Sequence, residues 1–393
     1  MNYDQLLNRT LKSLKPSGIR RFFDIANEMD DVISLSIGEP DFSTPWHIRQ
    51  EGIHTLEGGK TWYSPNAGLL QLREAISGYV ERHIHASYDP QNEILVTVGG
   101  SEAIDLGIRA LVNPGEEVLI PEPSFVCYAP LTEMAGGVPV PIVTKAQDGF
   151  RLTAEALKAA ITPRTKLLIL PYPNNPTGGV MRRRHLEEIA DVLRGTDILV
   201  LSDEIYGELT YGDEQHCSIV SLPGMQERTL LVSGFSKAFA MTGWRLGYAC
   251  GPAPILSAVV KLHQFAIMCA PTTAQYAAIE AMNNGEDDIE EMRTQYDMRR
   301  RFIVDELNKM GLTCFDPEGA FYAFPSIAIT GMTSEEFCHQ LLLDKHVAVV
   351  PGTAFGDSGE GFVRISYCYS LKHITEAMSR IRAFLEERTH QIP

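Results

Sequence analysis

A lysine set among small and apolar residues has the clearest chemical potential in this chain of 393 residues. Lys237 lies in the stretch Gly-Phe-Ser-Lys-Ala-Phe-Ala, just after the aliphatic run 229–232, and Arg245 follows within a segment rich in small residues. A lone lysine is most often a solvated cation or the partner of a carboxylate. Desolvation beside a second cation would instead lower the pKa of the amine and free it to form a Schiff base. The two cations also suit a bound anion.

A second anion site is indicated where the aliphatic run 94–98 leads into Gly99, Gly100, Ser101 and Glu102 and then into a helical pattern. Glycines let the backbone approach an anion, and the N–H groups at a helix N-terminus carry partial positive charge. A pair of glycines followed by a serine cap is also a common structural device. By itself this motif leaves both interpretations open.

Polar side chains follow two further strand-like runs. Asp203 ends the run 198–201, and Asn175 lies after the run 166–170 in a loop made rigid by three prolines. Ligands of open α/β proteins gather where strands give way to loops at their carboxyl ends. A carboxylate there indicates a buried ion pair, a metal or a cofactor, and the loop is either a tight turn or a holder for a small ligand.

Two aromatic residues and an arginine complete the set. Phe125 and Tyr128 follow the run 117–120, a place where aromatic residues more often belong to the core than to a binding site. Arg364 lies inside the apolar run 361–367. An arginine is costly to bury without a carboxylate partner, so a binding role for Arg364 is favoured.

Composition limits the class of protein. A hydrophobic content of 44% allows a large core, and the length favours two or three domains. The net charge of −16 disfavours binding to nucleic acid or to anionic membranes. No apolar run approaches the roughly 20 residues that span a bilayer, and the N-terminus lacks a secretory signal, so we expect a cytoplasmic protein.

Metal and disulfide sites are not expected. The seven cysteines are an odd number, widely scattered and without a CxxC pair, so we expect free thiols. His83 and His85 could form half of a metal site, but no ligand cluster lies near them in the sequence. We expect them to be solvated residues at a helix end.

The order of aliphatic and amphipathic segments predicts the fold class. The strand-like runs named above alternate with helical patterns such as 153–161 and 184–193, which is typical of an α/β domain with a mostly parallel sheet covered on both faces. After residue 285 the pattern changes. The expected elements there are, in chain order, a long charged helix at 287–310, a strand-like run at 319–325 and a helix at 334–343. Two further strand-like runs follow at 347–350 and 361–367. This part is expected to form a separate α+β unit.

The segment 234–247 resembles the lysine signature of the class I and II aminotransferases, which are pyridoxal-phosphate enzymes of fold type I. Other motifs of that family follow in order from Ser17 to Ser366. The resemblance implies an aspartate-aminotransferase-like fold. It also implies a large cofactor-binding domain at 46–285 and a small discontinuous domain formed by 1–45 and 286–393.

The resemblance also implies roles for the cofactor site. Lys237 would bind pyridoxal 5'-phosphate covalently and act as acid and base, and Asp203 would hold the pyridine nitrogen protonated. Tyr206 and Asn175 would donate to the ring 3-oxygen. The other expected cofactor contacts are Phe125 against the ring face, with Tyr128 in reserve, Gly100, Ser101, Glu102, Ser236 and Arg245 around the phosphate, and Tyr63 reaching the phosphate of the neighbouring subunit.

For the substrate, the family places the α-carboxylate on Arg364 and Asn175 and on the backbone of Gly38. One departure from the pattern concerns the phosphate. Many relatives have serine three residues before the lysine, where this chain has Gly234. We expect the contact to move to Ser236, to Ser101 or to the backbone.

The implied reaction is ping-pong transamination from an L-amino acid to a 2-oxo acid, with 2-oxoglutarate the expected acceptor. Apolar residues in the segment 17–23 favour neutral or aromatic donors. Ser101 stands where some aspartate-type relatives have lysine, which disfavours strict dicarboxylate specificity. Aspartate and N-acetyl-diaminopimelate aminotransferases and a pyridoxal-phosphate-dependent C-S β-lyase are the alternatives.

The family assembles as homodimers with shared active sites, so a homodimer is expected. A transcription regulator on this fold would need an added DNA-binding domain and a basic face, and the match from Ser17 and the net charge of −16 leave room for neither. A binding protein without activity would be expected to have lost Lys237 or Asp203, and both are present.

Overall fold

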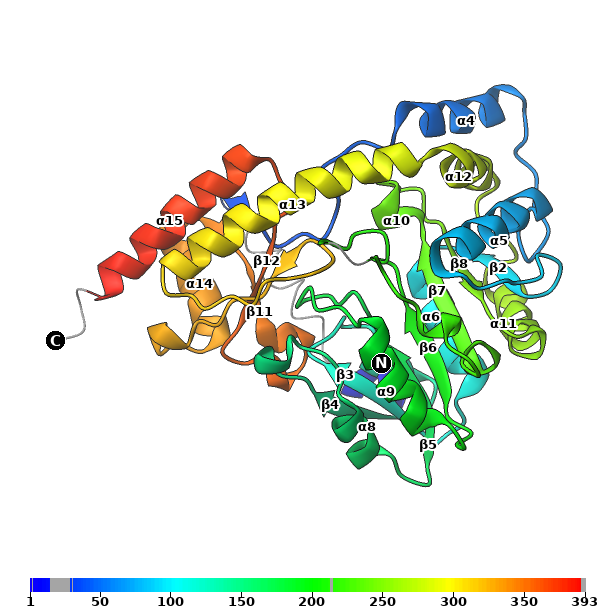
Figure 1. The fold of residues 1–393 in the computed structure, drawn as a ribbon, viewed down its shortest axis with the longest axis horizontal. Coiled ribbons are helices and arrows are strands. Elements are labelled where there is room, and N and C mark those ends of the chain that lie inside the picture. Colours follow the sequence, from blue (N-terminus) through cyan, green and yellow to red (C-terminus); the bar gives the residue numbers. More distant parts are fainter. Residues whose placement is uncertain (2, 15–28, 30, 213–214, 390–393) are drawn as a thin grey trace.

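A seven-stranded sheet forms the centre of the computed structural model, which describes residues 1, 3–14, 29, 31–212 and 215–389 (Figure 1). In spatial order the strands are β2 (Ile94–Thr97), β8 (Gly247–Cys250), β7 (Thr229–Gly234), β6 (Leu199–Asp203), β5 (Thr165–Leu170), β3 (Glu117–Glu122) and β4 (Val138–Val143). All run in one direction except β8, which is antiparallel to both of its neighbours. The predicted α/β class with a mostly parallel sheet is confirmed.

Both faces of this sheet are buried, which explains why its strands are continuous aliphatic runs. Along β5, Leu168 and Leu170 belong to one apolar cluster, whereas Leu167 and Ile169 belong to another. Successive side chains of a strand point to opposite faces, so each cluster marks one face. The first cluster contains residues of α4 (Trp46–Glu57), α5 (Leu70–Ile84), α8 (Ala154–Ala160), α9 (Arg183–Leu193) and α12 (Thr272–Asn284). The second contains residues of α6 (Gly100–Leu111), α7 (Tyr128–Met134) and α11 (Ala253–Ala266).

Two strands of the sheet were not expected from the sequence. β4 contains Pro139 and Pro141, which lack a backbone N–H, and it lies at the edge of the sheet beside β3 only. Proline is tolerated on an edge strand because one side needs no ladder partner. β8 follows the lysine motif directly and is a short glycine-led strand, so its sequence resembles a loop.

A second set of strands and helices is built from the C-terminal part of the chain. β11 (Val350–Pro351), β12 (Val363–Ser366) and β9 (Tyr322–Ala323) form an antiparallel sheet in this order. The long helix α13 (Glu286–Lys309) runs from the helices over the large sheet to α14 (Ser334–Lys345) and α15 (Leu371–Thr389), as Figure 1 shows. The expected single run 347–350 is divided between two sheets, since β10 (Val347–Ala348) pairs with the N-terminal strand β1 (Ile33–Ser34), whereas β11 belongs to the three-stranded sheet.

The N-terminal segment joins this second set. β1 (Ile33–Ser34) pairs in parallel with β10, and Leu35 donates its N–H to the carbonyl of Ala348 at 2.8 Å. Ile33 and Leu35 lie in the same apolar cluster as Phe337 of α14. We propose on this basis the division into 46–285 and the discontinuous 1–45 with 286–393. The helices α1 (Tyr3–Leu6), α2 (Arg9–Ser13) and α10 (Phe235–Ala238) complete the described α-helices.

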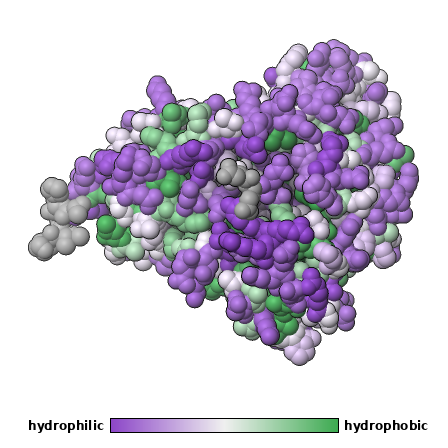
Figure 2. Space-filling model, viewed as in Figure 1, coloured by the Kyte–Doolittle hydropathy of each residue, from purple (hydrophilic) through white to green (hydrophobic). Residues whose placement is uncertain are grey.

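The surface drawn in Figure 2 is mostly hydrophilic, with apolar residues scattered between polar ones. Within the described part of the chain, no helix combines the length and the apolar character that crossing a membrane requires.

Candidate active site

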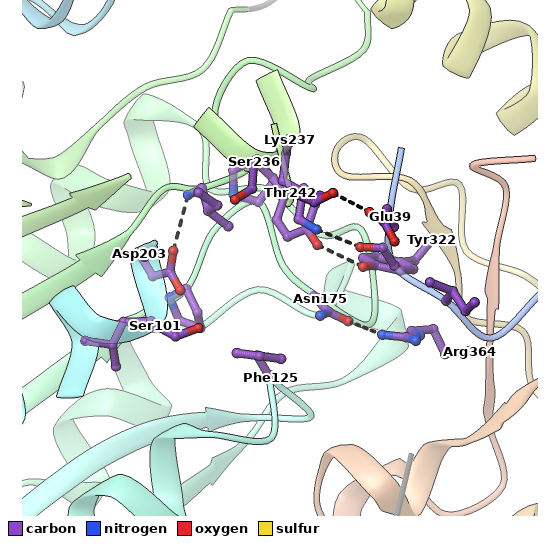
Figure 3. Close-up of a pocket in the computed structure, with 18 of the residues that line it drawn as sticks. Glu39, Ser101, Phe125, Asn175, Asp203, Ser236, Lys237, Thr242, Tyr322 and Arg364 are labelled. Carbon is purple, nitrogen blue, oxygen red and sulfur yellow. Dashed lines mark hydrogen bonds between the residues drawn. The ribbon is translucent and has the colours of Figure 1, made fainter. Parts of the chain in front are cut away.

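A cavity of about 540 Å³ lies at the carboxyl ends of the parallel strands, and the close-up in Figure 3 shows the side chains that point into it. Residues that follow β2, β3, β5, β6 and β7 meet residues of the N-terminal segment and of β9 and β12 there. The predicted residues in its wall are Gly38, Gly100, Ser101, Phe125, Asn175, Asp203, Tyr206, Ser236, Lys237, Arg245 and Arg364. Sequence positions up to 328 apart therefore meet in one cavity.

Lys237 is positioned by the abrupt change from β7 to the short helix α10. Its Nζ donates to the carbonyl oxygen of Gly38 at 2.6 Å. Burial lowers the pKa of the amine to about 8. Cys368 and Glu39 oppose this shift, whereas the guanidinium groups of Arg364 and Arg245 add to it. The lysine therefore gives up its proton far more readily than a solvated lysine does.

Asp203 is the last residue of β6, and its buried carboxylate is held at both oxygens. Oδ2 accepts a hydrogen bond from the hydroxyl of Tyr128 at 2.7 Å, and Oδ1 accepts one from the N–H of Ile205 at 3.2 Å. Burial raises the pKa of Asp203 to about 6, against the effect of these two donors. The carboxylate thus has a fixed direction and lacks a cationic partner of its own in the described residues.

An anion cradle forms at the N-terminus of α6, where Gly99 has a positive φ of 80°. A Cβ atom on Gly99 would lie 2.6 Å from Nη2 of Arg245, so the guanidinium occupies the space that a side chain would fill. Arg245 also donates to the carbonyl of Thr242 at 2.9 Å, which holds it there. Free helix N–H groups, a fixed cation and the nearby Ser101 and Ser236 together suit a phosphate group.

Steric crowding explains why position 234 is a glycine and not a serine. A Cβ atom there would lie 2.9 Å from Cα of Gly247, its partner across the antiparallel pair of β7 and β8. A serine would push the two backbones apart. Because Ser236 and Ser101 both line the cavity, they remain the expected hydroxyl donors for a phosphate.

Arg364 is buried on β12 and reaches Asn175 across the cavity (Figure 3). Nη1 donates to Oδ1 of Asn175 at 3.0 Å and Nη2 donates to the carbonyl of Ser36. Its Nε is buried without a partner in the described residues, and no carboxylate is paired with it there. A buried guanidinium with a free donor is suited to an anionic ligand.

Two tyrosines take roles that the sequence analysis did not assign. Tyr128 was the reserve for a ring contact, whereas in the structure its hydroxyl anchors Asp203. For Tyr322 the sequence predicts only a place in the strand-like run 319–325. The hydroxyl of Tyr322 lies 2.8 Å from the hydroxyl of Tyr206. The guanidinium of Arg364 lies over the Tyr322 ring, with the Arg364 Cζ 4.5 Å from the ring centroid. Nothing in the sequence near Tyr322 distinguishes it from a core residue.

Two predicted cofactor residues do not line the cavity. Glu102 points away from the cavity, where it accepts from the N–H of Val98 and pairs with Nδ1 of His263 at 2.8 Å. Tyr63 is 78% exposed on the surface of this single chain. The apolar segment 17–23, expected to line the substrate pocket, lies outside the described residues.

The seven cysteines are free. Within the described ranges, no group of three or more histidine, cysteine, aspartate or glutamate residues is arranged to hold a metal ion. The acid and base groups that line the cavity are Lys237, the carboxylates of Glu39 and Asp203, and the hydroxyls of Tyr128, Tyr206 and Tyr322.

Comparisons with known proteins agree with this geometry. The model of the family "Aminotransferase class I and II" matches residues 30–381. The chain is 53% identical to the putative aminotransferase YugH of Bacillus subtilis, over 98% of this chain and 99% of the relative. It is 48% identical to an aspartate aminotransferase of Pyrococcus abyssi, over 96% and 98% of the two chains. The crystal structure of an aromatic aminotransferase from Pyrococcus horikoshii superimposes with a TM-score of 0.90 at 47% identity, covering 94% of this chain and 99% of that one.

Proposed function

Because the chain belongs to the class I and II aminotransferases, we propose that it moves the amino group of a neutral or aromatic L-amino acid to a 2-oxo acid, with 2-oxoglutarate as the expected acceptor. The family is dependent on pyridoxal phosphate, and the protein is a transaminase. Bound pyridoxal phosphate supplies an aldehyde for covalent attachment and a ring that accepts the electrons of the broken Cα–H bond.

The residues of the cavity fit this cofactor. Arg245 above the N-terminus of α6 would hold the phosphate, and Asp203 would pair with the ring nitrogen. Lys237 offers the amine for covalent attachment, since its pKa of about 8 leaves a neutral fraction near physiological pH. The other proposed contacts are Asn175 and Tyr206 at the ring oxygen, Phe125 at the ring face, and Gly100, Ser101 and Ser236 at the phosphate.

Lys237 is the proposed acid and base of the reaction. With cofactor and substrate bound, the Nζ of Lys237 would accept the proton from the substrate Cα and would release it again to complete the transfer. A pKa near the working pH suits a group that must both take and release a proton. The Gly38 carbonyl, 2.6 Å from Nζ, restrains the amine on the substrate side of the cavity.

The free Nε donor of Arg364 is the observation that carries the proposed amino-acid substrate. Its guanidinium, directed by Asn175 and Ser36, would bind the α-carboxylate, and Gly38 would add a backbone contact. Fixing the carboxylate would limit the orientation of the bound amino acid, and with it which bond of Cα is broken. The binding energy is thus used for orientation, which selects loss of the Cα proton.

The preference for a neutral or aromatic side chain is supported by the cations of the cavity. Within the described residues its wall has three cations, Lys237, Arg245 and Arg364, and each already has a proposed role. A second substrate carboxylate finds no further cation among them. The distal carboxylate of 2-oxoglutarate would then need a donor other than these three cations.

An absorption spectrum with a donor panel tests this function. We expect the protein to show a visible cofactor band that is bleached by phenylalanine, tyrosine or leucine and restored by 2-oxoglutarate, with less bleaching by aspartate. Equal or faster reaction with aspartate would overturn the proposed preference. Release of pyruvate and free ammonia from a cysteine conjugate would instead identify the C-S lyase.

A homodimer is the proposed assembly, supported by an exposed apolar surface. Trp62, Tyr63, Phe265 and Met268 are exposed in the single chain, and two hydrogen bonds join their segments, from Asn66 to Met268 and from Thr272 to Trp62. Large exposed apolar surfaces usually mark an interface. Tyr63 lies on this surface, where it is available to the site of a second copy.

A further inference from the structure

Tyr206 and Tyr322 form a hydroxyl pair at the boundary between the proposed cofactor and substrate sites. Their oxygens lie 2.8 Å apart, and both side chains are buried. Either hydroxyl can be the donor in this pair. Tyr206 comes from the loop after β6 of the seven-stranded sheet, whereas Tyr322 comes from β9 of the three-stranded sheet, so the hydrogen bond joins these two parts of the molecule.

Both hydroxyls keep their protons at neutral pH. Burial raises the pKa of Tyr322 to about 12, and burial together with the neighbouring tyrosine raises the pKa of Tyr206 well above its ordinary range. The charged or titratable groups that face the pair are Lys237, Arg364 and Cys368. A hydroxyl has one proton to donate, so two neighbouring tyrosines can donate in sequence only if one directs its proton to the other.

The position of Tyr322 is fixed from two further sides. The Arg364 guanidinium lies over its ring at 4.5 Å, an arrangement that stabilises the ring and makes the hydroxyl a stronger donor. A Cβ atom on Gly38 would lie 2.0 Å from the hydroxyl oxygen, so the backbone of Gly38 is packed directly against it. The hydroxyl therefore has little freedom to leave Tyr206.

We propose that Tyr322 is a positioning residue that donates its hydroxyl proton to Tyr206 and thereby commits the proton of Tyr206 to the 3-oxygen of the bound cofactor. This inference rests on the proposed function, because it takes Tyr206 as the donor to that oxygen. Hydrogen bonds in a chain polarise one another, so the Tyr206 hydroxyl becomes a stronger donor than it would be alone. The cofactor's negative form is stabilised as a result.

The experiment is a pH titration of the visible absorbance of the holoenzyme without substrate, in wild type, Tyr206→Phe, Tyr322→Phe and the double variant. Losing either hydroxyl donor removes stabilisation of the deprotonated cofactor, so the pH midpoint of the absorbance titration should rise in both single variants. For Tyr322→Phe we expect a rise of about 0.3 to 1 pH unit, since one hydrogen bond is lost indirectly. The double variant should titrate like Tyr206→Phe, because Tyr322 acts only through Tyr206.

Tyr296→Phe is the matched control. Tyr296 is fully buried next to Phe321, and its hydroxyl has no hydrogen-bond partner within the described residues, so its removal should leave the midpoint unchanged. A Tyr322→Phe titration identical to wild type, or effects of the two single variants that add in the double variant, would overturn the relay alone. A wild-type protein without a pH-dependent visible band would overturn the proposed cofactor site and the relay together.

Discussion

At the scale of single residues, the site is marked by polar groups whose bonding is incomplete. Arg364 has a buried Nε without an acceptor, and Asp203 has two donors but no cation in the described residues. Proteins seldom bury a charged group without an opposite charge or a full set of hydrogen bonds, because taking the charge out of water is costly. Both groups line one cavity, so a cofactor and a substrate bound there together could supply the missing cation to Asp203 and the missing anion to Arg364.

Lys237→Ala is expected to abolish the visible band and to reduce transamination at least about 100-fold, because the covalent attachment point and the acid–base group are lost together. The spectrum after gel filtration and the initial rate are the measurements. Lys261→Ala, at an exposed lysine on α11, is the control and should behave as wild type. Full activity of Lys237→Ala would refute its proposed role.

Arg364→Ala should lower kcat/KM for amino acids by about 30-fold or more while the cofactor spectrum stays intact, because a buried charged contact to the substrate carboxylate is removed. Steady-state kinetics and a cofactor titration measure the two effects separately. Arg364→Lys should recover little of the loss, since a single ammonium cannot replace a planar guanidinium held by Asn175 and Ser36. Normal kinetics with loss of cofactor would contradict this assignment.

The pKa of Asp203 predicts how cofactor affinity depends on pH. Burial raises it from 3.8 to about 6, so the carboxylate is ionised above about pH 6 and neutral below it. Only the ionised form can hold a protonated ring nitrogen, so the affinity for pyridoxamine phosphate, which binds without a covalent link, should fall as the pH drops below about 6. Fluorescence titration between pH 5 and 8 measures this.

Asp203→Asn provides the comparison for that titration. The variant should bind more weakly at pH 7 and should lose the part of the pH dependence that comes from the carboxylate. Any dependence that remains belongs to other titrating groups, such as Lys237 and the ligand phosphate. An unchanged pH profile in Asp203→Asn would show that another group controls the affinity.

At the scale of secondary structure, an ion pair behind the cavity holds the end of β6. The buried carboxylate of Glu204 lies 2.6 Å from Nε2 of His216 and also accepts from the hydroxyls of Ser202 and Ser218. Glu204 follows Asp203 directly, so this cluster fixes the backbone that aims Asp203 at the cavity.

His216→Gln should therefore destabilise the fold in a pH-dependent way. Burial alone would lower the pKa of His216, but the Glu204 carboxylate outweighs it and raises the pKa above 6.5. A base whose pKa is raised in the folded state stabilises fully below about pH 6.5, and this contribution disappears as the pH rises through the raised pKa. Denaturant unfolding should show a loss of about 1–3 kcal/mol at pH 6, shrinking toward alkaline pH.

The exposed His339 gives the matched control, since His339→Gln should leave the unfolding free energy unchanged at every pH. A destabilisation of His216→Gln that is the same at pH 6 and pH 9 would show that the histidine acts by packing and not by charge.

The sequence predicts most elements of the large sheet, because strands buried on both faces must be aliphatic and their connections must be helices. It does not predict β4, whose prolines are tolerated only because the strand is at an edge, nor the separation of 347–350 into β10 and β11. Edge position and sheet membership depend on which segments meet in space. A local pattern carries no information on either.

The same limit applies inside the site. Residues with a distinctive local setting, such as Lys237 and Asn175, are predicted and line the cavity. Tyr322 is missed, because its importance comes from Tyr206, Arg364 and Gly38, which lie far from it in the sequence. The direction of Glu102 toward Val98 and His263 also follows from the fold and not from its motif.

At the scale of the whole molecule, the exposed apolar surface around Trp62 and Phe265 predicts self-association. Light scattering should give twice the chain mass of 43.6 kDa. Phe265→Glu should weaken the dimer, because it places a charge in the proposed interface, whereas Ile329→Glu, at an exposed apolar residue of the smaller sheet region, should not. A monomeric wild-type protein with full activity would rule out a shared site.

The pairing of β1 with β10 has a practical consequence for redesign. Residues 33–36 are joined by backbone hydrogen bonds to Ala348 and Ser366, and Ser36 also accepts from Arg364. The proposed substrate-binding residues Gly38 and Arg364 thus lie in segments that these hydrogen bonds join, whereas Lys237 and Asp203 lie at or just after the ends of strands of the large sheet. To transfer the substrate specificity of a relative, residues 33–38 and 347–366 would have to be exchanged together. If only one of the two segments were exchanged, its side chains would pack against a partner segment from the other protein.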